Sequence, residues 1–359
     1  FSMFFYNYLN NSNDSYENVN NNEVKWYNDT ISMMLETEAG SGNYEMTTAS
    51  SWPTDGYMFN TELSKCENGG ELSWDDENKR VLMSGNVSDK CYVYFDVIQV
   101  LFADYVKSLY TGTQGENGIY YHDSSLTNGA GDSSYRYSGA NPNNYVCFGS
   151  NESTCPTDNL YRIIGVFGNN VKLIKYDYGT TDELGTDGDY YQTYKEWGMD
   201  STYKGTYGDG ERIGVYYWNN ATQTNTWSES LLNKTNLNTN FINNIGEEWA
   251  NKIATTTWKV GGNTYSNIYS KTPSVVYQNE IVSPVTTNTT DNATEYTAKI
   301  GLMYVSDYGF AADPSAWTLT MGNYNNTTAT STNWMYMGLY EWTFSRRADL
   351  SGYAFRVDG

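Results

Sequence analysis

Residues 333–359 are the stretch of this sequence with the highest density of aromatic side chains. Aromatic residues recur there at about every second position, a spacing typical of strands that bury one face. A charged segment over residues 345–349 interrupts the pattern, which resumes at Tyr353 and continues to Val357. The stretch therefore predicts a core strand, a charged loop and a final strand. The side chains expected to be buried together are Trp334, Tyr336, Tyr340 and Trp342 with Ile163, Val166, Leu173 and Met303.

The composition favours an extracellular or cell-surface protein rich in β-structure. The 359 residues include 42 acidic and 21 basic side chains, and the resulting net charge of -21 repels the phosphates of nucleic acids. Tyrosine contributes 35 residues, an aromatic content that a disordered chain would lack. No run of about 18 apolar residues occurs, so we expect no transmembrane segment. The sequence begins at Phe1 without Met, which we interpret as a mature chain whose export signal has been removed.

The four cysteines predict two local disulfides. Cys66 and Cys91 flank a hairpin-rich segment, and Cys147 and Cys155 flank a short loop. An even number of cysteines in local pairs, without CxxC spacing, indicates disulfides and therefore an oxidising compartment. The alternative is a zinc site of four thiolates, which needs closely spaced pairs that the sequence lacks. We expect Trp74 to pack near the first disulfide.

The strand and helix patterns predict a β-rich α+β fold with three regions. Residues 1–40 are expected to form an N-terminal strand and a linker, and residues 41–97 an immunoglobulin-like β-sandwich. Residues 98–359 are expected to form the main domain. Its two expected helices span residues 97–110 and 239–253, where apolar side chains recur at helical spacing.

The residues that could carry chemistry do not predict an enzyme. His122 is the one histidine and lies in a segment rich in Gly, Ser and Asn, so we expect it to be solvated rather than catalytic. No cofactor is expected other than calcium, which binds to oxygen ligands. The calcium candidates are Asp182, Asp187 and Asp189, whose spacing differs from that of an EF-hand loop.

Three segments of the main domain resemble a family of secreted bacterial domains. "KIGLMYVSDYGFAADPSAW" at 299–317 precedes "LYEWT" at 339–343, and "YAFRV" at 353–357 follows a polar loop. This order resembles the Fibrobacter major paralogous domain and its relatives in gut Gram-positive bacteria, over residues 160–357 and more loosely over 66–95. These domains are similar in fold to C-type lectins and to the formylglycine-generating enzyme. The resemblance implies a C-type-lectin-like fold for residues 98–359.

The resemblance also carries expectations for single residues. It implies a buried, hydrogen-bonding role for Glu341 rather than a part in glycoside cleavage. The cysteines of the formylglycine-generating enzyme have no counterparts near this C-terminus, so that activity is not expected. Such domains usually continue into a closing strand of the "VRPVF" type, whereas this sequence stops at Gly359.

The C-terminal loop supplies the candidate ligand-facing residues. Its two arginines could contact an anion or a carboxylate, although arginines on a loop more often face only solvent. Some proteins of the resembling fold are diversified near the C-terminus by retroelements, and the Tyr, Asn, Ser and Asp content of this region is compatible with that. The candidates are Arg346, Arg347, Asp349 and Tyr353.

The N-terminal segment predicts a means of assembly. It contains no Pro, Gly or charge, and residues 10–22 after it form a polar linker with a reach of roughly 40 Å when extended. Such a strand could insert into the sheet of a neighbouring copy, as in donor-strand complementation, or could pair within its own chain. The residues of this assembly strand are Phe1, Met3, Phe4, Phe5, Tyr6, Tyr8 and Leu9.

Three functional hypotheses follow from these observations. The first is an extracellular, non-enzymatic structural or adhesive surface protein whose partners are copies of itself, as in a pilus-like filament. The second is a lectin-like module that binds a surface protein or a glycan. The third and least favoured is a carbohydrate-active enzyme.

Overall fold

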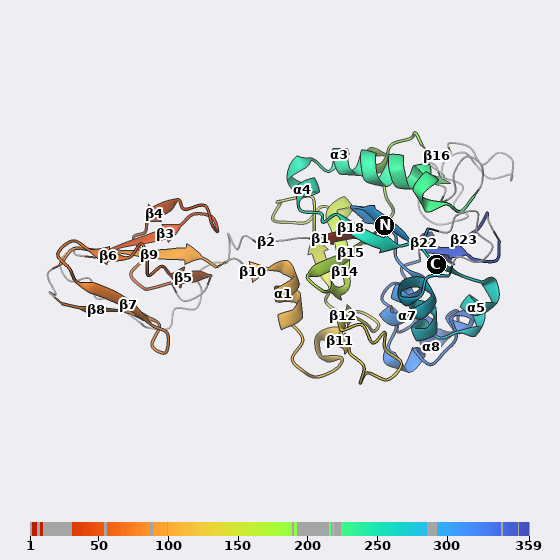
Figure 1. Ribbon diagram of the computed structural model, residues 1–359, viewed down its shortest axis with the longest axis horizontal. Coiled ribbons are helices and arrows are strands. Elements are labelled where there is room, and N and C mark those ends of the chain that lie inside the picture. The colour runs from red at the N-terminus through yellow and green to blue at the C-terminus, as the bar shows by residue number, and fades with distance from the viewer. Residues whose placement is uncertain are drawn as a thin grey trace. The chain divides into compact units, whose positions relative to one another are not determined.

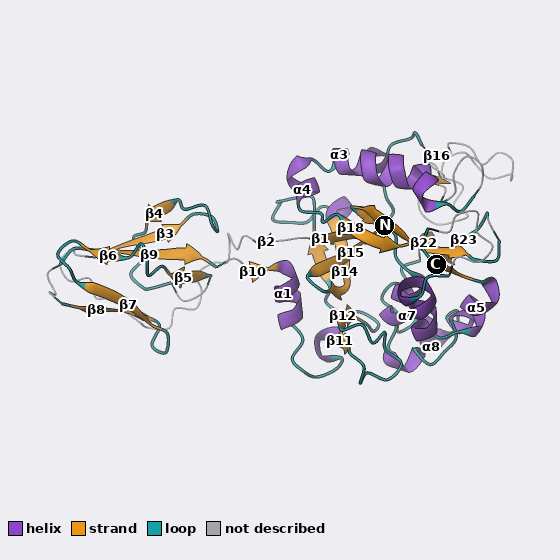
Figure 2. Ribbon diagram, viewed as in Figure 1, coloured by secondary structure: helices purple, strands orange, loops and turns teal. Residues whose placement is uncertain are grey.

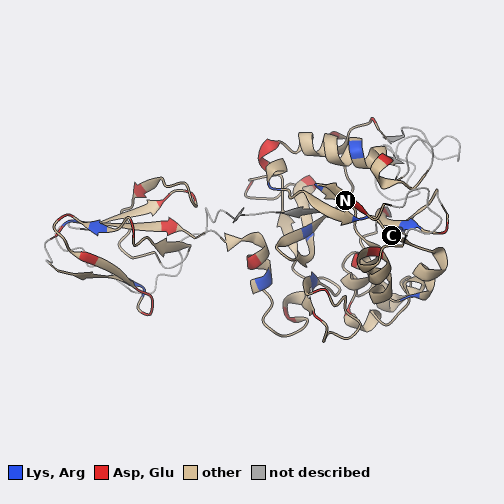
Figure 3. Ribbon diagram, viewed as in Figure 1, with Lys and Arg blue, Asp and Glu red and all other residues tan. Residues whose placement is uncertain are grey.

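The computed structural model divides the chain into a unit formed by Tyr8–Leu101 and a larger unit formed by Phe1–Asn7 and Phe102–Gly359. The structure is a β-rich α+β fold, and every helix that it describes belongs to the larger unit (Figure 2). Acidic and basic residues are spread along the ribbon of both units (Figure 3). The described residues are 2–5, 8–9, 31–53, 56–85, 89–98, 100–188, 190–191, 215–216, 218, 224–285, 293–338, 340–350 and 352–358.

The smaller unit contains a five-stranded sheet with a hairpin packed against it. The strand order is β4–β3–β9–β5, and β6 also pairs with β9, while β7 and β8 form the hairpin. Trp74 and Val81 of the hairpin pack on a core that includes Met33, Phe59 and Phe95. The strands are β2 (Tyr8–Leu9), β3 (Ile31–Glu36), β4 (Tyr44–Met46), β5 (Tyr57–Phe59), β6 (Lys65–Cys66), β7 (Glu71–Asp75), β8 (Arg80–Ser84), β9 (Cys91–Val97) and β10 (Val100–Leu101).

This sheet begins earlier in the chain than the sequence suggests. β3 starts at Ile31 and pairs in parallel with β9, so part of the segment predicted as a linker over 1–40 belongs to the sheet. β2 pairs with β10, which joins the first and last described strands of the unit. The predicted helix over 97–110 loses its first turn for the same reason: Val100 and Leu101 pair with Leu9 and Tyr8, and α1 begins only at Phe102.

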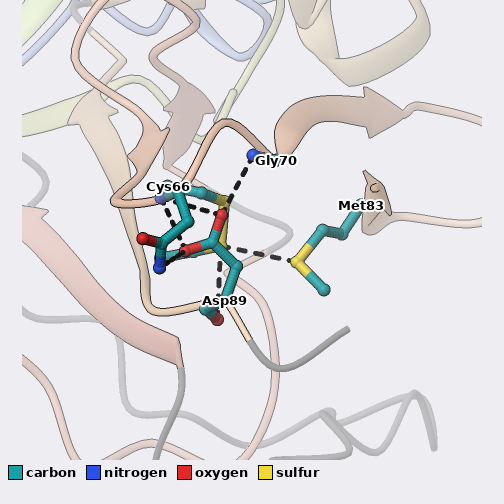
Figure 4. The surroundings of a disulfide bond; sticks show 6 residues. Cys66, Gly70, Met83 and Asp89 are labelled. Atoms are coloured by element: carbon teal, nitrogen blue, oxygen red, sulfur yellow. Dashed lines mark hydrogen bonds between the residues drawn. A yellow bond between two sulfur atoms is a disulfide. The ribbon is translucent and has the colours of Figure 1, made fainter. Parts of the chain in front are cut away.

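Both predicted disulfides are present. Cys66 and Cys91 face each other across β6 and β9 with 3.9 Å between their Cα atoms. Figure 4 shows the surroundings of this bridge, where the Asp89 carboxylate accepts hydrogen bonds from the backbone N–H groups of Asn68 and Gly70. The Sδ atom of Met83 lies 3.4 Å from the Cys91 sulfur. Cys147 and Cys155 form the second bridge, in the larger unit.

Trp74 contributes to the core of the smaller unit through aromatic contacts. Its ring stacks on Phe59 with 6.3 Å between centroids and meets the edge of Phe95 at 5.5 Å. Met83 lies against the sulfur of Cys91, and the packing of Trp74 near the bridge stays a prediction.

The larger unit is built on a seven-stranded antiparallel sheet. Its order is β11–β12–β14–β15–β1–β21, and β13 also pairs with β14. Consecutive side chains of β14 and β15 are buried, so both faces of the sheet are covered. The strands are β1 (Ser2–Phe5), β11 (Ile119–His122), β12 (Ser134–Tyr137), β13 (Tyr145–Cys147), β14 (Leu160–Phe167), β15 (Asn170–Lys175) and β21 (Ile300–Gly301).

β1 occupies an interior position of this sheet. It pairs with β15 along all four of its residues and with β21 through Ser2 and Met3. The single strand expected over residues 1–9 is therefore divided, because β1 joins the larger unit and β2 the smaller one. Of the predicted assembly-strand residues, Phe1 and Tyr6 lie outside the described part of the chain.

Short helices and minor sheets surround the main sheet (Figure 1). The α-helices are α1 (Phe102–Ser108), α2 (Thr181–Leu184), α3 (Ile242–Asn244), α4 (Glu247–Asn251), α5 (Tyr265–Ser270), α6 (Pro273–Tyr277), α7 (Val305–Ala311) and α8 (Thr327–Thr330). Two π-helical segments span Leu232–Phe241 and Gln278–Val282, and 3₁₀ turns span Glu116–Gly118, Thr157–Asn159, Trp227–Glu229, Pro314–Ala316 and Met321–Asn323. The remaining strands are β16 (Tyr190–Tyr191), β17 (Val215–Tyr216), β18 (Thr256–Lys259), β19 (Gly262–Asn263), β20 (Glu295–Ala298), β22 (Tyr340–Arg347) and β23 (Ala354–Asp358).

The predicted helix over 239–253 is present but interrupted. Gly246 lies between α3 and α4 with a φ of 86°, a backbone conformation that residues other than glycine rarely adopt. The helical region also begins earlier, with the π-helical segment from Leu232. The prediction of only two helices in the larger unit was wrong, since short helices such as α5 and α7 carry too few residues for a clear apolar period.

The C-terminal aromatic residues divide into buried and exposed positions. Trp334 is 2% exposed, and its indole N–H donates to the carbonyl of Tyr137 at 2.8 Å. Tyr336 is 44% exposed, so its predicted burial was wrong. The reason is that the residues between Asn333 and Gly338 form turns rather than a strand, which removes the assumed alternation.

The other expected core positions are mostly confirmed. Trp342 is half-buried, and its indole N–H donates to the carbonyl of Tyr216 at 3.0 Å. The side chain of Tyr340 lies outside the described part of the structure. The four aliphatic positions predicted to pack with these aromatic residues all belong to the main core: Ile163, Val166, Leu173 and Met303.

Replacing Trp334 with alanine should lower the free energy of unfolding by about 3–5 kcal/mol, the usual cost of truncating a buried aromatic side chain. Tyr336→Ala is the matched control two positions away and should change stability by less than about 0.5 kcal/mol. Urea unfolding of both variants, followed by tryptophan and tyrosine fluorescence and far-UV circular dichroism, measures the difference. Equal effects of the two substitutions would contradict the assignment of Trp334 to the core.

Candidate binding surface

Three exposed tyrosines mark one surface of the larger unit. Tyr265 and Tyr269 lie one helical turn apart on α5, and their ring centroids are 4.4 Å apart. Tyr353 lies just before β23. Their exposed fractions are 49%, 50% and 56%, which is high for such large side chains. Together with Arg347 and Asp349 they form what we call the tyrosine–arginine surface.

Arg347 links these tyrosines. Its guanidinium carbon lies 5.1 Å from the ring centroid of Tyr265 and 5.6 Å from that of Tyr353, within the range of cation–π attraction. Its Nε and Nη2 atoms donate to the two oxygens of Asp349 at 3.0 and 2.8 Å. The hydrogen bond with Asp349 raises the pKa of Arg347, and the hydrogen bond from Arg347 lowers the pKa of Asp349. The pair therefore stays ionised and keeps the guanidinium plane fixed.

A buried layer holds the loop that carries Arg347 and Tyr353. Asn225 is fully buried, and its amide Nδ2 donates to the carbonyls of Tyr353 at 2.8 Å and Arg347 at 3.1 Å. The backbone N–H of Arg347 also donates to the carbonyl of Tyr353 at 2.9 Å. One side-chain amide thus ties both ends of the loop, which fixes the tyrosine–arginine surface before any partner arrives.

Arg346 belongs to this buried layer rather than to the surface. It is 0% exposed, and its guanidinium donates to the carbonyl of Ala293 at 2.8 Å. The prediction that it faces a ligand was wrong, because residues 345–347 continue strand β22 and successive side chains alternate between its faces. Its backbone lies so close to Gly262 that a Cβ on that residue would be 2.0 Å from the Arg346 carbonyl oxygen. Only glycine fits there.

The other three predicted ligand-facing residues come together on the surface. Arg347, Asp349 and Tyr353 all reach solvent at least in part. Sequence reasoning missed Tyr265 and Tyr269 on α5. The sequence does contain a signal for this helix: Thr264 is a residue type that caps helices, and two tyrosines four positions apart follow it. In the structure, Thr264 accepts a hydrogen bond from the backbone N–H of Asn267. What the sequence could not show is that α5 lies beside the C-terminal loop.

The calcium candidates do not form a described metal site. Oδ1 of Asp187 accepts a hydrogen bond from the amide of Asn240 at 2.7 Å, and the backbone carbonyl of Asp182 accepts one from Asn244 at 2.8 Å. Asp189 lies outside the described residues. Within the described ranges, no group of three or more His, Cys, Asp or Glu side chains is arranged to hold a metal ion.

His122 is buried, which corrects the expectation of a solvated loop residue. It closes strand β11 at 0% exposure, with its ring 5.0 Å from both Phe310 and Trp317. Its Nδ1 accepts the backbone N–H of Ala130 at 3.1 Å, and Nε2 has no hydrogen-bond partner among the described residues. Burial, and then the charge of Arg136, hold the pKa of His122 well below its usual range. The sequence predicted a loop here because β11 is only four residues long and the residues that follow His122 are typical of turns.

Two glutamates, Glu280 at 0% exposure and the partly buried Glu341, have raised pKa values. Burial raises the pKa of Glu341 to about 7, and its Oε2 accepts no hydrogen bond from the described residues, so the expected hydrogen-bonding role is not seen for that oxygen. Burial also raises the pKa of Glu280 to about 7. Glu280 accepts the backbone N–H groups of Val305 and Ser306 at the start of α7, and the hydroxyl of Ser345 also donates to it.

Comparisons of the chain with protein-family models, with curated proteins and with solved structures find no match. The structure itself therefore defines the class: a disulfide-bearing, β-rich α+β protein with a preformed tyrosine–arginine surface on its larger unit. No described helix is long and apolar enough to cross a membrane.

The buried His122 should make stability depend on pH. The unfolded histidine has a pKa of about 6.5, whereas the folded one titrates well below it. Below about pH 6.5 the unfolded state therefore binds more protons, and the free energy of unfolding should fall by up to about 1.4 kcal/mol per pH unit. The raised pKa values of Glu280 and Glu341 act in the opposite direction between about pH 4.5 and 7.

His122→Gln separates these contributions, because it removes one titrating group and leaves both glutamates. In urea unfolding at pH 7.5, 6.5 and 5.5, the free energy of unfolding of the wild type relative to that of His122→Gln should fall below pH 6.5, because the contributions of the two glutamates are common to both proteins. Identical pH profiles would show that His122 is not held neutral in the folded protein.

Proposed function

We propose that this protein is an extracellular, non-enzymatic adhesive protein that binds a protein partner through the tyrosine–arginine surface. The observation that carries the proposal is the fixed position of Arg347 between Tyr265 and Tyr353, supported from below by Asn225. Tyrosine and arginine are enriched among the residues that dominate protein–protein binding energy. Tyrosine loses little conformational entropy on contact, and a fixed loop lowers the cost further.

The surroundings of this surface support a protein partner of modest charge. The Arg347–Asp349 pair leaves the surface close to neutral, although the whole chain carries a net charge of -21. Like-charge repulsion disfavours strongly acidic partners such as nucleic acids. The two disulfides support an oxidising, extracellular location.

The finer fold descriptions belong to the same proposal. The sheet and hairpin packed around Met33 and Phe95 support an immunoglobulin-like smaller unit. A central antiparallel sheet with a C-terminal hairpin, β22 and β23, supports a C-type-lectin-like larger unit. The resemblance to the Fibrobacter major paralogous domain rests on the sequence segments alone.

The double substitution Arg347→Ala/Tyr353→Ala should weaken adhesion. Loss of two central contact residues should weaken binding by about 10- to 100-fold, at about 1.4 kcal/mol for each factor of ten. Binding of the full chain to immobilised fibronectin and collagen, measured by biolayer interferometry, provides the readout, and a glycan array provides the comparison. Tyr105→Ala, which removes a similarly exposed tyrosine on α1, is the matched control and should bind as the wild type does.

The outcomes separate the hypotheses. Protein binding that the double variant loses and Tyr105→Ala keeps supports the proposal. Binding only to glycans, lost in the same variant, would replace it with the lectin-like alternative. Equal binding by all three proteins would overturn the role of the tyrosine–arginine surface.

A specific observation favours a second function, as the subunit of a filament assembled by strand exchange. β1 lies between β15 and β21, yet in sequence it is separated from both by the whole of the smaller unit. In the single chain this strand pairs in cis. If β1 left the sheet, the backbone N–H and C=O groups of β15 that it pairs with would be exposed. The β1 of a second copy has the same sequence and could take its place.

The edge of β21 that faces away from β1 already has hydrogen-bond partners at Ile300. This supports strand exchange at β1 rather than addition of a strand to the edge of the sheet. The side-chain amide of Asn238 donates to the carbonyl of Ile300 at 3.0 Å, and its oxygen accepts the N–H of Ile300 at 2.9 Å. Asn238 thus takes up the hydrogen-bonding groups of β21 that an added strand would use.

Deletion of residues 1–10 should abolish polymers if β1 is exchanged between copies. A second variant, Ser2→Cys/Ile174→Cys, places two thiols at directly paired positions and should lock β1 in its own sheet when oxidised. Light scattering after size exclusion and negative-stain microscopy measure assembly, with the reduced form of the same variant as the control. A wild-type protein that remains monomeric at high concentration would rule out the filament function and leave the adhesive one standing.

A further inference from the structure

A pocket of about 220 Å³, partly open to solvent, lies in the larger unit and is lined by none of the residues of the tyrosine–arginine surface. Strands β12, β15 and β18 and the start of α7 all contribute side chains to its lining. At about 30 Å³ per water molecule, the volume corresponds to about seven waters. It is smaller than the 300–1,000 Å³ of pockets for drug-sized ligands, so a single ring is the largest ligand that fits.

The charged side chains at this cavity already neutralise one another. Arg136 donates to Asp132 at 2.7 Å and to Asp307 at 3.3 Å, and Lys172 donates to the other oxygen of Asp307 at 2.6 Å. Two cations and two anions therefore balance within this group, and Lys259, the third cation of the lining, is paired with Glu295. A charged ligand would bring an uncompensated charge next to buried ion pairs, which is unfavourable. The site consequently favours a neutral ligand.

The same side chains offer hydrogen bonds to a neutral ligand. The guanidinium of Arg136 has five N–H groups, of which three donate to Ser134, Asp132 and Asp307 among the described residues, and Oδ1 of Asp307 accepts from Arg136 there. Asn170 adds a buried amide oxygen, Oδ1, that has no hydrogen-bond partner among the described residues. A buried acceptor of this kind is costly unless a donor pairs with it.

Aromatic rings form the remaining walls. Trp258, Tyr277 and Tyr304 line the cavity beside the charged group. The Lys172 ammonium lies 4.3 Å from the ring centroid of Tyr304, and the Arg136 guanidinium lies 5.4 Å from that of Tyr277. Polar groups and aromatic rings thus meet in one small space, as in sites that take an amphipathic, hydroxyl-bearing ring.

We propose that this cavity binds one neutral, hydroxyl-rich ring molecule, a monosaccharide. Its hydroxyls would donate to Oδ1 of Asp307 and Oδ1 of Asn170 and accept from Arg136. The C–H faces of the ring would lie against the aromatic walls. The proposal is independent of the adhesive function, because it uses no residue of the tyrosine–arginine surface.

Calorimetric titration and saturation-transfer NMR of the full chain test the proposal, with glucose, galactose, mannose and N-acetylglucosamine as probes. At least one sugar should bind at millimolar concentration or tighter. Two variants act on the cavity: Thr256→Phe places a ring in its lining, and Asn170→Ala removes the unpaired acceptor. Each should weaken binding at least tenfold.

Two controls make the result specific. Thr328→Phe carries the same change at an exposed position on α8 that does not line the pocket, and should bind the sugar as the wild type does. Arg347→Ala/Tyr353→Ala should also keep sugar binding even if it loses adhesion. Absence of binding for all four sugars, or binding that Thr256→Phe and Asn170→Ala leave unchanged, would overturn the assignment.

Discussion

The ion pairs of Asp307 connect the two layers of the larger unit. Asp307 lies in α7, where its carboxylate accepts the backbone N–H of Tyr304 at 2.8 Å and caps the helix start. The same carboxylate binds Arg136 of β12 and Lys172 of β15, both almost wholly buried. Removing one partner of such a buried pair typically costs about 3–5 kcal/mol, because the other charge stays buried and uncompensated. The packing of α7 on the sheet, and the shape of the cavity beside it, depend on this one carboxylate.

The sequence predicted those parts of the fold in which local pattern and tertiary structure agree. β14 and β15 are apolar runs bounded by turns, and Cys66 and Cys91 are local partners, so neighbouring residues alone carried the information. Prediction failed where a distant segment decides the local structure. Leu101 has the spacing of a helical residue but pairs with β2, because a strand more than ninety positions earlier in the chain is available to it.

The candidate surface was also predictable only where local sequence pattern decides the structure. The charged and aromatic residues of the C-terminal loop indicated a solvent-facing site, and Arg347, Asp349 and Tyr353 do reach the surface. Arg346 could not be separated from Arg347 without knowing how far β22 extends. The contribution of α5 and of Asn225 comes from packing between segments far apart in sequence, which no local pattern reports.

The position of β1 has a consequence for the order of folding during synthesis. Ser2 pairs with Gly301, so the first described strand of the chain can complete its sheet only after nearly the whole chain has been made. At about 5–20 residues per second, the ribosome needs about 15–60 s to travel between these two positions. The smaller unit, whose strands all lie in between, has its full sequence available far sooner. β1 precedes β15 in the chain and can pair with it as soon as β15 is made, whereas the other edge of β1 stays without its partner strand until β21 follows.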